Sequence, residues 1–167
     1  VYKRQIVNGT IVAADLADDA VTSAKIADNT IVVGNMAAGT LKMPGTRNIG
    51  IGASSLVGGS LTGIDNICIG VNTGENITDG DLNVFIGSYA GQDATEADYS
   101  VGIGYKALTD ITTGDHNIAI GSNAIKEGKR GCCQIALGQD ALNKSCGNWN
   151  IAFGSQALKN NTTGTNN

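Results

Sequence analysis

The chain has 167 residues, a formal net charge of −4 and only 16% charged residues, which leaves no basic stripe of the kind that binds nucleic-acid phosphates. It contains 24 glycines, one proline and 4% aromatic residues, too few bulky side chains for an ordinary globular interior, yet its 41% hydrophobic content is too high for a disordered linker. No apolar run approaches the roughly 20 residues that span a bilayer, so we expect no membrane insertion in this segment. The composition predicts an ordered repeat with a thin aliphatic core.

Residues 1–41 carry a period close to ten residues, with turn-prone Gly, Asp or Asn at the joints. One chain with so little apolar surface per repeat could hardly fold alone, so we predict a fibre shaft in which several chains share a core. Residues 42–47, which include Pro44, are interpreted as the joint to the next pattern. The recurring apolar positions are Ile11, Val21, Ile31 and Leu41; Leu16, Ile26 and Met36; and Ala17, Ala27 and Ala37.

Residues 48–167 carry seven repeats, each anchored on a glycine that follows two apolar residues spaced two apart. Successive anchor glycines are 18, 17, 17, 17, 17 and 16 residues apart. A spacing of two is the strand period, so each repeat is predicted to contain a short strand and to be stable only when stacked on its neighbours. The anchors are Gly52, Gly70, Gly87, Gly104, Gly121, Gly138 and Gly154.

The apolar pair before each anchor is expected to point into a core, because both residues lie on one face of the strand. The residue between them is mostly small and apolar, which is unusual for a solvated face and suggests that another copy of the chain covers it. The pairs are Ile49/Ile51, Ile67/Ile69, Val84/Ile86, Val101/Ile103, Ile118/Ile120, Ile135/Leu137 and Ile151/Phe153. The residues between them are Gly50, Cys68, Phe85, Gly102, Ala119, Ala136 and Ala152.

Two more columns complete the repeat. The residue before each apolar pair is polar, and a small residue followed by a large aliphatic comes after each anchor, where the pair is predicted to close the turn over the core. Gly74 and Gly91 replace the large aliphatic in two repeats. The chain ends at Asn166 and Asn167, where an eighth repeat would begin, so we expect a longer fibre. The polar column is Asn48, Asn66, Asn83, Ser100, Asn117, Gln134 and Asn150, and the pairs begin at Ser55, Thr73, Ala90, Ala107, Ala124, Ala141 and Ala157.

Residues suited to catalysis or metal binding are sparse. His116 is the only histidine, and no Gly-x-Ser-x-Gly, phosphate-binding loop or His-Glu-x-x-His pattern occurs, so we predict neither an enzyme nor a cofactor. The four cysteines lack the spacing of a zinc site and are interpreted as buried thiols, with disulfides left open. Carboxylates in two loops are interpreted as solvated turns rather than a calcium site or a hydrolase pair. The cysteines are Cys68, Cys132, Cys133 and Cys146, and the carboxylates are Glu75, Asp79, Asp81, Asp93, Glu96 and Asp98.

Four residues are candidates for receptor contact. Trp149 and Tyr99 occupy equivalent turn positions and are candidates for stacking on a carbohydrate. Lys129 and Arg130 lie in a basic loop that would suit an anionic glycan.

The segments Asn117–Ile125 and Asn150–Leu158, the second followed by Thr162-Thr163-Gly164, closely resemble the head repeats of trimeric autotransporter adhesins and similar repeats in phage tail fibres. Residues 19–31 resemble tail-fibre shaft sequence, which favours the phage side. The resemblance implies a homotrimer in which each subunit forms a left-handed parallel β-roll and the three rolls pack round a common axis. An interwound triple-stranded β-helix is the structural alternative.

The expected fold is therefore all-β, a parallel β-roll or solenoid with turns of about 17 residues. The expected partners of each chain are two identical chains, which complete a homotrimer. The expected function is a structural segment of an extracellular or virion fibre that spaces or presents a receptor-binding tip. One alternative is an adhesin whose repeats bind host glycan or protein directly. An ice-binding solenoid ranks last, because the threonines form no regular two-per-turn column.

Overall fold

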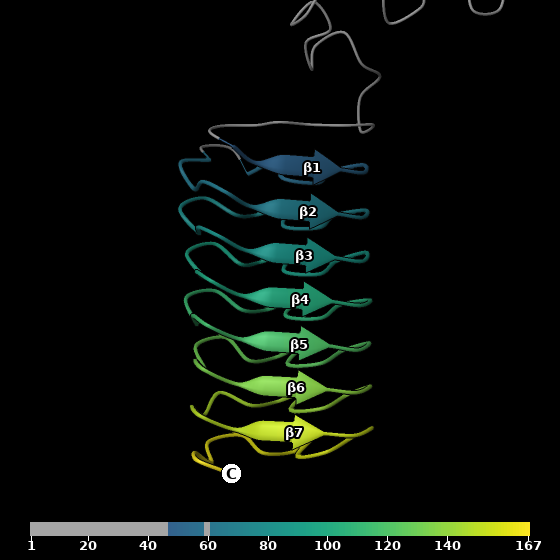
Figure 1. Ribbon diagram of the computed structural model, residues 1–167, viewed down its shortest axis with the longest axis vertical. Coiled ribbons are helices and arrows are strands. Elements are labelled where there is room, and N and C mark those ends of the chain that lie inside the picture. Colours follow the sequence, from purple (N-terminus) through teal and green to yellow (C-terminus); the bar gives the residue numbers. More distant parts are fainter. Residues whose placement is uncertain (1–46, 59–60) are drawn as a thin grey trace, which may run out of the picture. The chain divides into compact units, whose positions relative to one another are not determined.

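A computed structural model describes residues 47–58 and 61–167; the predicted shaft at residues 1–41 and most of the predicted joint lie outside this part. The described chain forms seven three-residue strands that stack in chain order as one parallel sheet, with a tight turn after each strand and a longer loop before the next (Figure 1). The strands are β1 (Ile49–Ile51), β2 (Ile67–Ile69), β3 (Val84–Ile86), β4 (Val101–Ile103), β5 (Ile118–Ile120), β6 (Ile135–Leu137) and β7 (Ile151–Phe153).

Neighbouring strands pair residue for residue, so equivalent positions of successive repeats lie directly above one another. Gly50 pairs with Cys68, for example, and Cys68 pairs with Phe85. This register confirms the predicted all-β solenoid with turns of about 17 residues. All the described strand pairings form within one chain, which is the architecture of a single-chain roll and not of the interwound triple-stranded alternative.

The predicted orientation of the strands was wrong. The residue between the apolar pair is buried in every strand, whereas the apolar pair itself points outward and is exposed or half-buried. The turn that follows the strand packs against its inner face: a Cβ placed on Gly50 would lie 3.2 Å from the Ser55 hydroxyl and 3.4 Å from the Leu56 side chain. The middle residue is Gly or Ala in the five repeats whose following turn supplies a large aliphatic side chain. The period of two was therefore correct, and its phase was inverted by one residue.

The core combines the middle strand residues with the small-large pair that follows each anchor glycine. Leu108, Ile125 and Leu142 are fully buried, as are the alanines before them, which confirms the predicted burial of this pair. Ile77 and Ile111 add two buried side chains from the longer loops.

The two repeats that lack the large aliphatic compensate for it in the strand. Cys68 and Phe85 are the only middle strand residues larger than alanine, and they occur in the repeats that carry Gly74 and Gly91. A Cβ on Gly74 would lie 2.5 Å from the Cys68 sulfur, and a Cβ on Gly91 would overlap the Phe85 ring. In the Gly91 repeat the strand thus supplies the bulky side chain that the turn supplies elsewhere. In the Gly74 repeat Cys68 shares this space with Ile77, whose Cδ1 would lie 2.8 Å from the same Cβ.

Three columns of the repeat have left-handed backbone conformation, which is uncommon for residues other than glycine. One column is buried except at Leu158 in the last repeat, and it contains Leu108 at φ 54° and Gly91 at φ 57°. The other two lie on the surface, one just after and one just before each strand. The column after the strand is Ser54, Asn72, Tyr89, Lys106, Asn123, Asp140 and Gln156. The column before it is Arg47, Asp65, Leu82, Tyr99, His116, Cys133, Trp149 and Asn166.

The polar column before each strand forms a buried ladder, which the sequence analysis did not foresee. Asn83 is 0% exposed, and its side-chain amide donates to the carbonyl of Ala97 at 2.6 Å. Its backbone N–H donates to Asn66 Oδ1 at 3.0 Å, while its own Oδ1 accepts from the backbone N–H of Ser100 at 2.9 Å. Each asparagine thus forms hydrogen bonds with its own loop and with the turns above and below. Because these partners are buried, the side chain must point inward.

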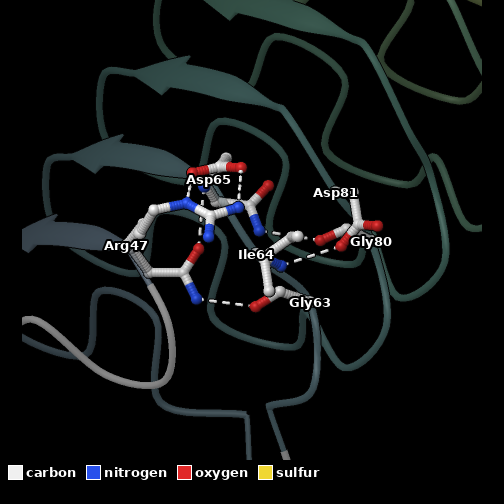
Figure 2. Close-up of polar contacts among 8 residues, drawn as sticks. Arg47, Gly63, Ile64, Asp65, Gly80 and Asp81 are labelled. Carbon is white, nitrogen blue, oxygen red and sulfur yellow. Dashed lines mark hydrogen bonds and ion pairs between the residues drawn. The ribbon is translucent and has the colours of Figure 1, made fainter.

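Figure 2 shows the start of this ladder. Asn48 donates to the carbonyl of Gly63 at 2.7 Å, and the Arg47 guanidinium lies 2.6 Å from the Asp65 carboxylate. Hydrogen bonding to Arg47 lowers the pKa of Asp65. The ladder is imperfect at Gln134, whose buried Oε1 has no partner within the described residues. That residue begins the single 16-residue repeat. Its side-chain amide donates to the carbonyl of Ser145 at 3.5 Å, whereas in this part of the chain its oxygen lacks the backbone N–H donor that Asn83 Oδ1 finds in Ser100.

Candidate functional site

The outward face of the sheet carries an apolar stripe of fourteen side chains, two from each of the seven strands. No polar residue interrupts it, because the same two outward positions are aliphatic or aromatic in every strand. Ile51 is 40% exposed and Ile120 is 41% exposed, although stacking against their own neighbours already covers part of each. A continuous apolar surface of this kind is typical of an interaction site. We call it the outward stripe; its members are the apolar pairs given above from Ile49/Ile51 to Ile151/Phe153.

The edge that follows the strands carries an aromatic and cationic cluster, here called the post-strand cluster: Tyr89, Tyr105 and Lys106. The two tyrosine rings meet edge to face with centroids 5.9 Å apart. The Lys106 ammonium lies 5.6 Å from the centre of the Tyr89 ring and 5.2 Å from that of Tyr105, within cation–π range. Lys106 forms no ion pair with another described residue. This cluster was not predicted from the sequence, although the equivalent positions of Tyr89 and Lys106 in successive repeats place them in one column.

The edge that precedes the strands carries an acidic and aromatic row, here called the pre-strand row: Asp81, Asp98, Asp115, Tyr99 and His116. Asp98 accepts a hydrogen bond from the backbone N–H of Asp81 at 2.7 Å, and Asp115 accepts one from the N–H of Asp98 at 3.0 Å. These bonds use one oxygen of each carboxylate; the other has no partner among the described residues. The rings of Tyr99 and His116 stack 4.9 Å apart at an angle of 19°.

The four predicted receptor contacts all lie on the surface. Trp149 and Tyr99 belong to the same left-handed column, as their equivalent positions predicted, and are 61% and 53% exposed. Lys129 and Arg130 are exposed and make no ion pair in the described part of the chain. The structure brings Tyr99 together with His116 and does not join the basic loop to Trp149 by any hydrogen bond or ion pair among these residues.

The cysteines were predicted to be buried, and only Cys68 is. Burial raises the pKa of its thiol. Cys132 and Cys133 are half-buried and Cys146 is exposed, so the prediction was wrong for these three. Desolvation is the main cause that raises the pKa of the Cys133 thiol, and a hydrogen bond with Cys132 raises it further. All four thiols are free.

Within residues 47–58 and 61–167, no three His, Cys, Asp or Glu side chains gather closely enough to hold a metal ion. The same residues include no helix that is long and apolar enough to cross a membrane.

The fold and its surfaces define the class of protein: the chain contains a parallel β-solenoid. No protein-family model, curated protein sequence or solved structure matches it.

Proposed function

We propose that this chain is a structural segment of a homotrimeric fibre, in a virion tail or on a cell surface, and that it spaces or presents a receptor-binding tip. The observation that carries the proposal is the outward stripe, which is apolar at every level of the stack. The resemblance of Asn117–Ile125 and Asn150–Leu158 to adhesin-head and tail-fibre repeats supports the trimeric state. The proposed role is mechanical and requires no catalytic residue.

Identical chains are the best partners for the outward stripe. A partner that covers the whole stripe must present apolar residues at the inter-strand spacing of about 4.8 Å over the same length. A second copy of the solenoid meets this requirement without adjustment. Cyclic symmetry about an axis parallel to the stack would bring three stripes together in register and close the assembly. The small middle column, whose composition suggests a covering copy of the chain, lies inside the chain and offers no surface to a partner. The outward stripe is the apolar surface that remains for a second copy.

Replacing Ile103 and Ile120 with aspartate should dissociate the trimer. Each change places a carboxylate in the apolar interface without a partner, and every assembly would contain it three times, so the trimer should weaken about a hundredfold or more. Sedimentation equilibrium measures the assembly state, and circular dichroism reports whether the strands persist. Val57→Asp, at an exposed aliphatic outside the strands, should leave the trimer intact. A folded monomer formed by the unmodified chain would refute the proposed function.

The adhesin alternative is supported by the exposure of Trp149, a large aromatic side chain at the surface. If the repeats bind a host glycan, Trp149→Ala combined with Lys129→Ala and Arg130→Ala should abolish cell binding, because the stacking surface and the basic loop are both removed. Flow cytometry with labelled protein measures binding, and an unchanged circular dichroism spectrum shows that the fold is retained. Lys144→Ala, at an exposed lysine elsewhere, is the control. Unchanged binding by the triple variant would exclude this alternative.

A further inference from the structure

We infer that the post-strand cluster of one subunit docks against the pre-strand row of the next, with Lys106 lying between the carboxylates of Asp98 and Asp115. This inference rests on the proposed trimer and adds to it a specific contact between neighbouring subunits. The apolar stripe makes the subunits associate, and the two edges fix their register and their rotation about the axis.

The placement of the two edges follows from the order of the chain. In each repeat the pre-strand column comes shortly before the strand and the post-strand column comes shortly after it. The two edges therefore lie at opposite ends of the stacked strands (Figure 1). When a cyclic assembly turns every stripe towards a common axis, the trailing edge of one subunit faces the leading edge of its neighbour. The contact is heterologous and closes into a ring.

The levels of the two edges also match. Asp98 and Tyr99 precede β4, Lys106 follows β4, and Asp115 and His116 precede β5. The backbone N–H of His116 donates to the carbonyl of Asp98 at 3.0 Å, so the two carboxylates belong to adjacent levels about one inter-strand spacing apart. Lys106 lies half a turn beyond Asp98 and half a turn short of Asp115. Because subunits related by an axis along the stack meet at equal heights, the ammonium of Lys106 would face the space between the two carboxylates.

The chemistry of the two edges is complementary. The post-strand cluster presents a cation that is held over two tyrosine rings and has no carboxylate partner among the described residues. The pre-strand row presents three carboxylates, each fixed by one backbone hydrogen bond and each with a second oxygen that lacks a described partner. The backbone bonds and the ring contacts hold both sets of charges in place before the subunits meet, which lowers the entropic cost of pairing them. The aromatic rings on both edges would shield these pairs from water.

Isotope-resolved cross-linking tests this contact directly. Trimers are assembled from an equal mixture of unlabelled and isotope-labelled chains and treated with a carbodiimide, which joins an ammonium to a touching carboxylate as an amide. Mass spectrometry should find the peptide of Lys106 linked to the peptide of Asp98 or Asp115, with mixed labels that prove a bond between chains. Lys106→Arg should keep the assembly and lose the link, because a guanidinium forms no stable amide under these conditions.

Charge reversal provides the energetic test. Lys106→Glu should weaken the trimer about tenfold or more, and Asp98→Asn together with Asp115→Asn should reduce that penalty, since the amides keep the backbone hydrogen bonds but remove the repulsion. Lys144→Glu, at an exposed position on neither edge, should have little effect. A trimer whose Lys106 forms only same-label links, or no link to either aspartate, would overturn this contact while leaving the trimer in place. A monomer would overturn the proposed function as well.

Discussion

Phe85→Ala is expected to lower the free energy of unfolding by about 3–5 kcal/mol, the usual range for removing a buried aromatic side chain. Phe85 is fully buried and is the largest side chain in the core. It is also the only bulky group at its level, because the position that holds Leu108 in the next repeat is Gly91 here. The cavity would therefore lie between two levels of the stack and weaken the contacts that each turn makes with its neighbours. Urea unfolding followed by circular dichroism measures the loss.

Adding Gly91→Leu to Phe85→Ala should recover most of that stability. The pair would give this repeat the composition of the next ones, in which a small strand residue lies opposite a leucine. Gly91 already has φ 57°, close to the 54° of Leu108, so the leucine requires no new backbone conformation. Gly91→Leu alone should cost about 1–3 kcal/mol, because the new side chain overlaps the Phe85 ring. If the two changes were simply additive, the proposed exchange of volume between strand and turn would be wrong.

The anchor glycines should also tolerate substitution poorly. Gly104→Ala is expected to cost about 4 kcal/mol or more, which is exceptional for a single added methyl group. Gly104 has φ 132°, a conformation that residues with a Cβ rarely adopt. The added Cβ would also lie 2.8 Å from the backbone of Gly121 in the next turn. The backbone on both sides belongs to the stacked sheet, so neither part can move away without breaking strand pairing. Thermal and urea unfolding measure the effect.

Gly154→Ala separates the backbone strain of a positive φ from the steric clash with the next turn. Gly154 has φ 120°, but nothing lies within 4 Å of a Cβ built on it. This substitution should therefore cost only the conformational strain, about 1–3 kcal/mol. The difference between the two variants measures how closely successive turns approach. Equal losses at the two glycines would show that backbone strain alone, and not the packing of one turn on the next, keeps these positions as glycine.

The sequence determined the repeat, because the period is a property of the chain itself. Residues that recur every 17 positions must occupy equivalent environments in a stack, so the strand positions and the anchor glycines could be predicted without knowing how the loops return. Trp149 and Tyr99 could be placed in one surface column by the same counting. The sequence also shows that Phe85 and Gly91, each unusual for its column, occur in the same repeat. It does not show that the two positions are in contact.

The tertiary structure decided which face of each strand is the inside. An alternating strand has two faces, and its pattern alone does not say which one the returning loop covers. Ile118 and Ile120 are the more apolar residues, yet Ala119 is the buried one, and the fully buried Ile125 of the following turn supplies the bulky side chain of that repeat. Asn117 is buried for a different reason, since its amide donates to the carbonyl of Gly131 inside the turn. The outward stripe and its flanking edges are surfaces because the loop covers the other face of each strand.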